Sequence, residues 1–216
     1  MTTLLIATRN THKIGEIRAI LGEQFDLLTL KDFPTAPAVI EDADTFAGNA
    51  AKKALELAGW LNTPQASANR QQARPDFVMA DDSGLEVDAL SGAPGVHSAR
   101  FAALDKIENS PDADNNAKLL RLLQNVPLEK RSARFRCLIA LAEVQSPNSK
   151  LQSPQLFDGE CDGKILLAPR GENGFGYDPL FVPEGFDRTF AELDDDAKNR
   201  LSHRARALEK LRWWFC

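Results

Sequence analysis

The sequence predicts a mixed α/β protein, and three observations support this. Residues 4–7 are a short apolar run typical of a buried strand, and a polar loop and an amphipathic stretch over residues 13–21 follow directly. Residues 46–61 repeat the apolar spacing of a second helix. Residues 132–144 and 156–167 are typical of two strands joined by a polar loop, an arrangement that favours antiparallel pairing. We therefore expect a mixed central sheet flanked by helices.

Composition indicates one globular domain over residues 1–216, with 43% hydrophobic and 26% charged residues. The net charge of −5 argues against a protein that coats nucleic acid, because such proteins are usually basic. The three cysteines are odd in number and lack C-x-x-C spacing, which favours reduced thiols. No apolar run is long enough to span a bilayer, and the N-terminus lacks a signal-peptide pattern. These features predict a cytoplasmic protein without membrane or nucleic-acid partners.

The acidic stretch Asp81, Asp82, Ser83 and Gly84 follows residues 77–80, an apolar run predicted to be a buried strand that ends there. Loops at strand ends in α/β proteins collect catalytic and binding groups. Neighbouring side chains of an extended chain point to opposite faces, so the two aspartates are expected to do different jobs. A plain turn is equally compatible with these residues. The stretch alone leaves both interpretations open.

The polar loop after the first strand is a candidate anion site, because the helix that follows offers unbonded N–H groups at its start. Thr8 and Asn10 can add hydrogen bonds, and Lys13 can reach a phosphate. The alternative is an ordinary strand–helix turn in which Asn10 or Thr11 caps the helix.

Asp44 or Thr45 is expected to cap the second helix, so Glu41, just before them, is not needed for that purpose. Lys53 lies within this helix, and Lys52 beside it is expected on a solvated face. Carboxylates and cations of this kind suit a substrate that carries magnesium and phosphates. There is no G-x-x-x-x-G-K-[ST] loop, which excludes a P-loop nucleotide site.

Residues 170–179 place an aromatic, Phe175, between glycines, and no helix is predicted directly after them, so a Rossmann fingerprint is excluded. Phe175 can offer its ring face to a flat base, or it can be buried in the core of an irregular hairpin. Lys198, His203 and Arg204 gather at the start of the last helix, where positive side chains are unfavourable unless an anion binds. Residues 62–75 are polar without hydrophobic period and are predicted to be a surface insertion.

Six stretches in this order resemble the Ham1/RdgB family of inosine/xanthosine triphosphate pyrophosphatases: residues 8–13, 45–54, 80–85, 92–100, 174–179 and 202–204. The resemblance covers nearly the whole chain. Residues 62–75 are longer than the usual connection, and His97 stands where an aromatic is common in the family. These departures bear on local packing or dimer contacts and not on the chemistry.

The resemblance implies a homodimer whose subunit has two lobes, an elongated sheet and an active-site cleft between the lobes. It implies Mg²⁺-dependent hydrolysis of ITP, dITP and XTP to the monophosphate and pyrophosphate. Asp82 would be the catalytic acceptor and a metal ligand, Glu41 the second metal-site carboxylate, and Asp81 a supporting acid. Lys53 would be a further catalytic group that also contacts the triphosphate. The other implied contacts with the triphosphate come from Ser83, Thr8, Arg9, Asn10, Thr11, His12 and Lys13. The implied contacts with the base and sugar come from Phe175, Gly176, Tyr177, Asp178, Lys198, His203 and Arg204.

His203 and Arg204 are the expected readers of the purine 6-keto oxygen, because an oxo group accepts hydrogen bonds where the amino group of adenine donates them. The sequence alone does not separate Asp81 from Asp82 as the base.

Three alternatives were compared with this interpretation. A Maf-like pyrimidine nucleotide pyrophosphatase is disfavoured by Phe175 and residues 202–204. A nucleotide sensor without turnover is disfavoured by Glu41, Asp82 and Lys53. An RNA-binding module is disfavoured by the acidic balance of the chain.

Overall fold

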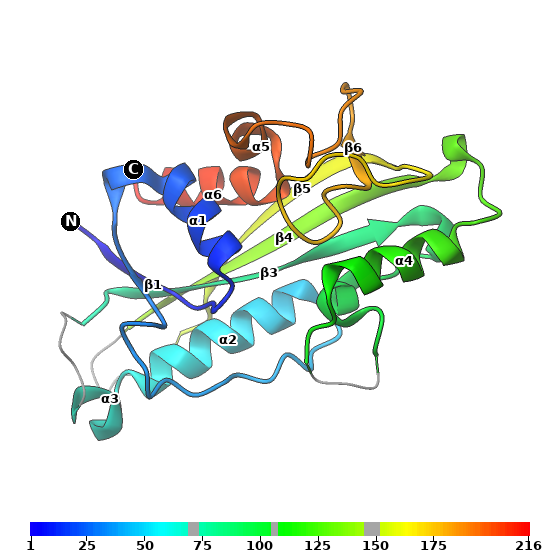
Figure 1. Ribbon diagram of the computed structural model, residues 1–216. Helices are drawn as coiled ribbons and strands as arrows, with labels where there is room; N and C mark the ends of the chain where they lie inside the picture. The colour runs from blue at the N-terminus through cyan, green and yellow to red at the C-terminus, as the bar shows by residue number, and fades with distance from the viewer. Residues whose placement is uncertain (69–73, 105–107, 145–151) are drawn as a thin grey trace. The chain divides into compact units, whose positions relative to one another are not determined.

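The computed structural model describes residues 1–68, 74–104, 108–144 and 152–216. Its strands form one six-stranded sheet in the order β2-β1-β3-β4-β5-β6 (Figure 1). The β1 strand runs parallel to both β2 and β3, whereas β6 runs antiparallel to β5, so the sheet is mixed as predicted. The strands are β1 (Thr3–Ile6), β2 (Asp26–Thr29), β3 (Phe77–Val87), β4 (Ser132–Glu143), β5 (Gln155–Ile165) and β6 (Phe181–Pro183).

Six helices are described: α1 (Thr11–Leu21), α2 (Phe46–Trp60), α3 (Pro64–Ala68), α4 (Asp112–Leu122), α5 (Asp195–Leu201) and α6 (His203–Trp214). Short 3₁₀ turns occur at Gly22–Gln24, Asp88–Leu90, Gly95–Arg100 and Leu128–Lys130. None of the described helices combines the length and apolarity that a membrane crossing requires.

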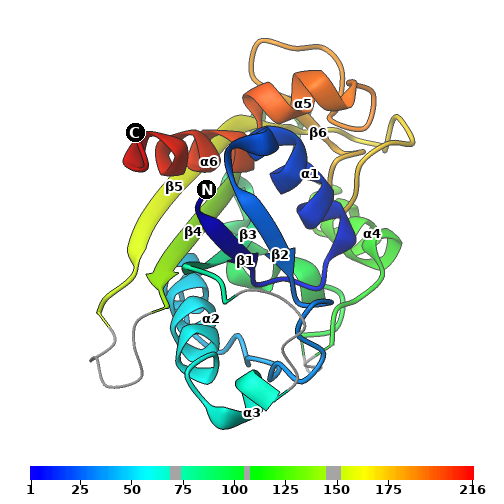
Figure 2. The same cartoon turned by 90° about the vertical axis from the view of Figure 1, so that its left-hand side faces the viewer.

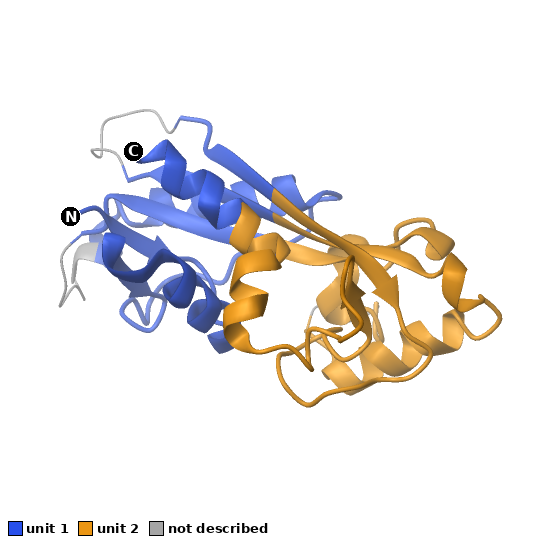
Figure 3. Ribbon diagram, turned by 90° about the horizontal axis from the view of Figure 1, so that it is seen from above, with its two compact units in different colours: residues 1–82, 138–158, 207–216 blue, residues 83–137, 159–206 orange. Residues whose placement is uncertain are grey.

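The chain divides into two compact units (Figure 3). Unit 1 comprises residues 1–82, 138–158 and 207–216, and unit 2 comprises residues 83–137 and 159–206. Each unit has its own cluster of buried apolar side chains. The cleft implied between two lobes stays a prediction, as does the single catalytic domain.

In unit 1, α1 and α2 lie on opposite sides of β1 and β2 (Figure 2). The core on the α2 side packs Ala50, Ala54 and Leu57 of that helix against Leu5 and Val78 of the sheet. These alanines are small and fully buried, so α2 packs closely on the strands. Close packing fixes the position of every other side chain that the helix carries, including Asn49 and Lys53.

The first turns of α1 and α2 are set by capping side chains, which is the alternative to an anion site at α1 and the expected arrangement at α2. Asn10 precedes α1, and its side-chain oxygen accepts hydrogen bonds from the backbone N–H groups of His12 and Lys13. Thr45 precedes α2, and its hydroxyl accepts from the N–H of Gly48. Of the two caps considered for the second helix, Thr45 is therefore the one used.

The core of unit 2 is aromatic. The rings of Phe135 and Phe181 meet edge to face with centroids 4.7 Å apart, and Phe190 contacts both. The α4 helix adds Leu119, and Leu123 follows directly after the helix; both are fully buried. This core anchors the segment of residues 174–178, because Tyr177 of that segment belongs to the same cluster.

The structure corrects three expectations about local structure. Residues 81–84 are not a loop at a strand end, because β3 continues without interruption to Val87. The sequence of residues 191–200 predicts a helix over the whole stretch, but the helix begins only at Asp195, where Asp194 accepts a hydrogen bond from the N–H of Ala197. The leucines of residues 114–125 predict a helix with Leu122 in its apolar stripe, but Leu122 is 46% exposed.

Two further expectations concern loops. Residues 64–68 of the proposed insertion form α3, and residues 69–73 of it lie outside the described residues. Most of the polar loop expected over 145–155 lies outside them as well.

Candidate active site

Asp81 and Asp82 are consecutive residues of β3, and their side chains meet different cations of unit 1. Asp81 forms an ion pair with the ammonium group of Lys13 in α1. Asp82 lies 3.9 Å from Nζ of Lys53 in α2. The alternation of an extended chain thus assigns the two carboxylates to different partners, as expected from their sequence positions.

Lys53 is the centre of the unit 1 cluster. Its Nζ donates to the backbone carbonyl of Asp81 at 2.7 Å and to Oε1 of Glu41 at 3.1 Å. The residue is only 8% exposed, so its charge is compensated by these oxygens and by Asp82 rather than by water. By contrast, Lys52 pairs with the exposed Asp42, as expected for a solvated position.

Asp82 is 6% exposed, and its Oδ2 has no hydrogen-bond donor among the described residues. Burial raises the pKa of this carboxyl to about 6, although Lys53 and Lys13 both act to lower it. A buried carboxylate oxygen without a donor is costly in a folded chain. Such groups persist where a ligand or a reacting group supplies the missing partner.

Glu41 precedes α2 and completes the acidic face of the cluster through its contact with Lys53. Nearby, Asn49 is buried in α2, and its Oδ1 accepts a hydrogen bond from the N–H of Ala43. This bond ties the segment that carries Glu41 to the first turns of the helix. The position of the glutamate is therefore set by α2, although the residue lies outside the helix.

The residues fit a magnesium ion bound with substrate and not a closed protein cage. Among the described residues, no three His, Cys, Asp or Glu side chains converge as a metal site would require. Mg²⁺ needs only one or two carboxylates, because it keeps several waters and binds phosphate oxygens. Oδ2 of Asp82, which has no hydrogen-bond partner among the described residues, is a suitable first ligand atom. Glu41 is a suitable second carboxylate, because it contacts Lys53, the lysine that also lies beside Asp82.

The loop that leads into α1 is held by its own side chains. The hydroxyl of Thr8 accepts a hydrogen bond from the N–H of Asn10, and Asn10 caps the helix. A guanidinium nitrogen of Arg9 donates to the carbonyl of Ala36. Thr11 and His12 are exposed in the first turn of α1, at its positive end. Of this loop and turn, the structure places only Lys13 in the carboxylate cluster.

A second group of predicted residues gathers in unit 2. Nζ of Lys198 lies 2.6 Å from Oδ2 of Asp178 and 4.8 Å from the ring centroid of Phe175. Both members of the ion pair are buried, and the cation lies over a partly exposed ring. Asp178 also accepts a hydrogen bond from the N–H of Phe175 at 2.9 Å. One carboxylate therefore holds both the aromatic and the cation above it.

The loop around Phe175 depends on the glycine at position 174. Gly174 has a φ of 76°, and a Cβ there would collide with the carboxylate of Asp178. Tyr177, predicted to contact base or sugar, points into the core, where its hydroxyl donates to the carbonyl of Ser98. Burial and the charge of Asp112 both raise the pKa of Tyr177, so it stays protonated.

His203 and Arg204 are both buried at the start of α6. The imidazole of His203 stacks on Phe135 with centroids 4.9 Å apart. A guanidinium nitrogen of Arg204 donates to the hydroxyl of Ser83 at 2.9 Å. The hydroxyl of Ser202 caps this helix by accepting a hydrogen bond from the N–H of Ala205.

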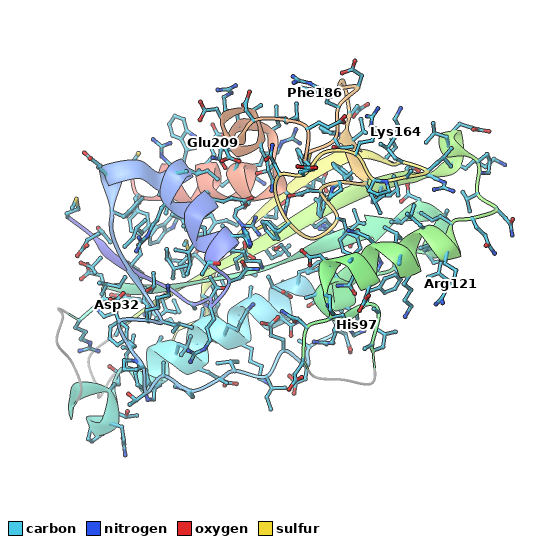
Figure 4. All side chains as sticks on the ribbon, viewed as in Figure 1. Asp32, His97, Arg121, Lys164, Phe186 and Glu209 are labelled. Carbon is cyan, nitrogen blue, oxygen red and sulfur yellow. The ribbon has the colours of Figure 1, made fainter. Side chains whose placement is uncertain are left out.

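Sequence reasoning missed three residues that position these groups: Asn49, Asp112 and Asn116. Asp112 and Asn116 act on the backbone of a distant segment, which no local pattern reveals; the bond between Asp112 and Gly176 spans 64 positions. Asn49 acts on the N–H of Ala43, six positions away. Asn116 is a half-buried polar residue of α4, and nothing in the local sequence indicates its partner. His97 is exposed beside α4 (Figure 4). Its ring nitrogen lies 3.3 Å from a guanidinium nitrogen of Arg100.

Comparison with known proteins connects this arrangement to one family. The chain is 50% identical over 213 residues to a dITP/XTP pyrophosphatase of Geobacter sulfurreducens, covering 98% of this chain and 96% of the relative. A dITP/XTP pyrophosphatase of Desulforamulus reducens is 46% identical, over 96% of this chain and 92% of the relative. A solved HAM1 protein from Coxiella burnetii superposes with a TM-score of 0.80 at 36% identity, covering 100% of this chain and 98% of that one.

A second solved structure, the Ham1 protein of Staphylococcus aureus, gives a TM-score of 0.77 at 34% identity over 99% of this chain and 98% of that one. The family model of the Ham1 family matches residues 4–214. On this near-complete match in sequence and fold, the chain belongs to the Ham1 family.

Proposed function

We propose that this chain is a nucleoside triphosphate pyrophosphatase that hydrolyses the non-canonical purine nucleotides dITP, ITP and XTP to the monophosphate and pyrophosphate. Relatives that match almost the whole chain carry the name dITP/XTP pyrophosphatase. The observation that carries the assignment to this site is Asp82, a buried carboxyl with a raised pKa beside Lys53. Hydrolysis of dITP, ITP and XTP would cleanse the nucleotide pool of these non-canonical triphosphates.

The unit 1 cluster is assigned to the triphosphate part of the substrate. Glu41 and Asp82 would hold Mg²⁺, which when bound polarises phosphoryl oxygens and lowers the pKa of an attacking water. Asp82 orients that water and accepts its proton as the oxygen attacks phosphorus; the bond to the leaving pyrophosphate breaks. Lys53 offsets the negative charge that develops on the phosphates. A carboxyl pKa of about 6 suits a proton acceptor near neutral pH.

Further triphosphate contacts are assigned to Ser83 and to the segment that opens α1. Lys13 adds positive charge, and Asp81 holds it in place. The first turn of α1 lies at the positive end of the helix and carries the exposed residues Thr11 and His12, which suits phosphate oxygens. The residues of this segment in the proposal are Thr8, Arg9, Asn10, Thr11, His12 and Lys13.

The unit 2 group is assigned to the base and sugar. Phe175 offers a ring face, and Gly176 leaves room for close approach. His203 and Arg204 are the proposed donors to the 6-keto oxygen, supported by their burial and by the fixed stacking of the imidazole on Phe135. Asp178 and Lys198 act beside the ring, and Tyr177 supports the loop from the core.

The proposal also includes a homodimer, a small-molecule nucleotide as the main partner, and a cytoplasmic location, because the nucleotide pool is there. Sedimentation at several protein concentrations tests the dimer: a mass near twice 23.8 kDa is expected, and a single-chain mass would refute it.

The test of function is pyrophosphate release from dITP, XTP, ITP, GTP, ATP and dTTP, with Mg²⁺ and with a chelator. Release from dITP, XTP and ITP alone, lost on chelation, is expected. Release chiefly from dTTP would point to a pyrimidine enzyme, and binding of dITP without release would point to a sensor. Asp82→Asn should abolish release, whereas Asp42→Asn, at the exposed acid that pairs with Lys52, should leave it unchanged.

A further inference from the structure

The backbone of Gly176 is held from both sides by one helix. Oδ2 of Asp112 accepts a hydrogen bond from the N–H of Gly176 at 2.6 Å. Nδ2 of Asn116 donates to the carbonyl of the same glycine at 2.9 Å. Asp112 and Asn116 are one turn apart in α4, so they lie on one face of the helix. This pair of residues is called the α4 clamp below.

The α4 clamp completes a set of bonds around Phe175. The N–H of Phe175 donates to Asp178, and its carbonyl accepts from the N–H of Asp178 at 3.2 Å. The next peptide N–H and the carbonyl after it belong to Gly176 and are held by α4. The N–H and carbonyl groups of Phe175 and Gly176 thus all have hydrogen-bond partners. These bonds hold Gly176 at a φ of 62°, a conformation that a glycine in a flexible loop would leave easily.

The α4 clamp is itself anchored. Asn115 of the same helix is buried, accepts from the N–H of Ala102 at 2.7 Å and donates to the carbonyl of Ala99. Leu119 and Leu123 fix the helix to the core of unit 2. The carboxylate of Asp112 also lies at the positive end of α4, where a negative charge is favourable. The helix is therefore a rigid support and not another mobile part of the loop.

We propose that Asp112 and Asn116 are positioning residues that hold Gly176, and through it the ring of Phe175, in the orientation that receives the purine base. This inference rests on the proposed function. It assigns base affinity to a helix that contributes no side chain to the proposed substrate contacts. Loss of the clamp should weaken substrate binding without slowing the chemical step, because the carboxylates and Lys53 belong to a different part of the chain.

The first test compares single variants with the unaltered enzyme in dITP hydrolysis. Asp112→Ala and Asn116→Ala should each raise KM for dITP about five- to tenfold, the size expected for one lost hydrogen bond. Their kcat should stay within about twofold, since the lost interaction is made equally before and during reaction. Asp112→Asn keeps an acceptor oxygen and should restore most of the affinity.

Two variants supply matched controls. Asp114→Ala removes the other acid from the first turn of α4, at an exposed position with no side-chain hydrogen bond recorded among the described residues. It should leave KM unchanged, which separates the clamp from a general effect of helix charge. Asn116→Asp keeps the shape but turns a donor into an acceptor that faces the Gly176 carbonyl, so it should raise KM at least as much as Asn116→Ala.

A double-mutant cycle with Phe175→Ala distinguishes positioning from plain structural support. If the clamp acts through the ring, Asp112→Ala should change KM by less than about twofold in a chain that already lacks it. An equal rise in KM with and without the ring would overturn the proposal. Urea unfolding shows whether each variant is folded. If Asp112→Ala does not fold, the same comparison is made with Asn116→Asp.

The outcomes separate the two levels of inference. No release of pyrophosphate from dITP by the unaltered enzyme overturns the proposed function and this inference with it. Normal release with an unchanged KM in Asp112→Ala and Asn116→Asp overturns the role of the clamp alone.

Discussion

Asp82 is a buried acid, and burying its negative charge lowers the stability of the folded chain. A residue with a purely structural role is not expected to have this destabilising effect. Two lysines, Lys53 and Lys13, lower its pKa, yet desolvation outweighs them and the pKa rises to about 6. Its Oδ2 meets no donor among the described residues. A carboxylate that binds metal and phosphate, as proposed for Asp82, is expected to lack partners in this way until its ligands are bound.

This imbalance predicts how stability depends on pH. The pKa of Asp82 in the folded chain is raised above the usual 3.8, so folding favours the protonated carboxyl. The stability that protonation of Asp82 contributes is therefore fully present below about pH 4 and is lost as the pH rises to about 6. Asp82→Asn should therefore stabilise the chain at pH 8 by about 1–3 kcal/mol in chelator and have little effect at pH 4. Urea unfolding at both pH values measures the difference.

The control for this prediction is Asp42→Asn. Asp42 is an exposed acid whose pKa is lowered by its hydrogen bond to Lys52, so the same change there should give no stabilisation at pH 8. Added Mg²⁺ should narrow the gap between Asp82→Asn and the unaltered chain, because bound metal stabilises the carboxylate. If Asp82→Asn and the unaltered chain were equally stable at pH 8 in chelator, burial of the Asp82 carboxylate would not destabilise the chain, and the prediction would be wrong.

Two neighbouring lysines allow a matched comparison at the same scale. Lys53→Met removes a buried cation from Glu41, Asp82 and the carbonyl of Asp81, so we expect both strong loss of turnover and destabilisation of about 3 kcal/mol at neutral pH. Lys52→Met removes only exposed contacts and should change stability by less than about 0.5 kcal/mol.

Pyrophosphate release and urea unfolding measure the two effects separately. Turnover that survives in folded Lys53→Met would remove this lysine from catalysis. A large effect of Lys52→Met would show that the exposed face of α2 matters more than its contacts indicate.

At the scale of elements, α2 is the support of the carboxylate–lysine cluster, and its N-terminus is closed by Thr45. Thr45→Ala should destabilise the chain by about 1 kcal/mol, the usual cost of losing a capping hydroxyl. Thr45→Ser keeps the acceptor for the N–H of Gly48 and should cost less than half as much. Thermal or urea unfolding measures both; identical losses in the two variants would mean that the methyl group, not the hydroxyl, is responsible.

The elements that the sequence predicted well are those with a strong local pattern. In β4, residues 133, 135, 137, 139 and 141 are buried in alternation, and both faces are buried over residues 139–142, as the apolar pattern indicates. The α2 helix is capped by Thr45, one of the two caps expected there, whereas Asn10 caps α1 as in the alternative to an anion site. Family membership was also predicted from six short stretches and is confirmed over residues 4–214.

The failures arise where tertiary partners decide. The acidic stretch was expected to be a loop because Asp, Ser and Gly favour turns, but Lys13 and Lys53 compensate the charges and allow β3 to continue. The α4 clamp could not be predicted at all, because its partner is a glycine backbone that carries no side chain for a pattern to reveal. The roles assigned to individual site residues stay predictions.

At the scale of the whole molecule, the three cysteines report how tightly the chain is packed. Cys137 and Cys161 are 0% and 2% exposed, whereas Cys216, the last residue, is exposed. Burial also raises the pKa of Cys161 to about 11, so even at moderately alkaline pH its thiol is protonated and poorly nucleophilic. Reaction of either buried thiol therefore requires the core of unit 2 to open.

Ellman's reagent at pH 8 should accordingly label one thiol per chain at once and the other two only on a timescale of opening, or after unfolding in urea. Cys216→Ser should remove the fast phase completely, which identifies it. Saturating dITP with Mg²⁺, given to an Asp82→Asn chain that binds without turnover, should slow the remaining labelling, because a ligand that binds only the folded state lowers the open population. Rapid labelling of all three thiols in the native chain would mean that the core of unit 2 opens far more often than its close aromatic packing implies.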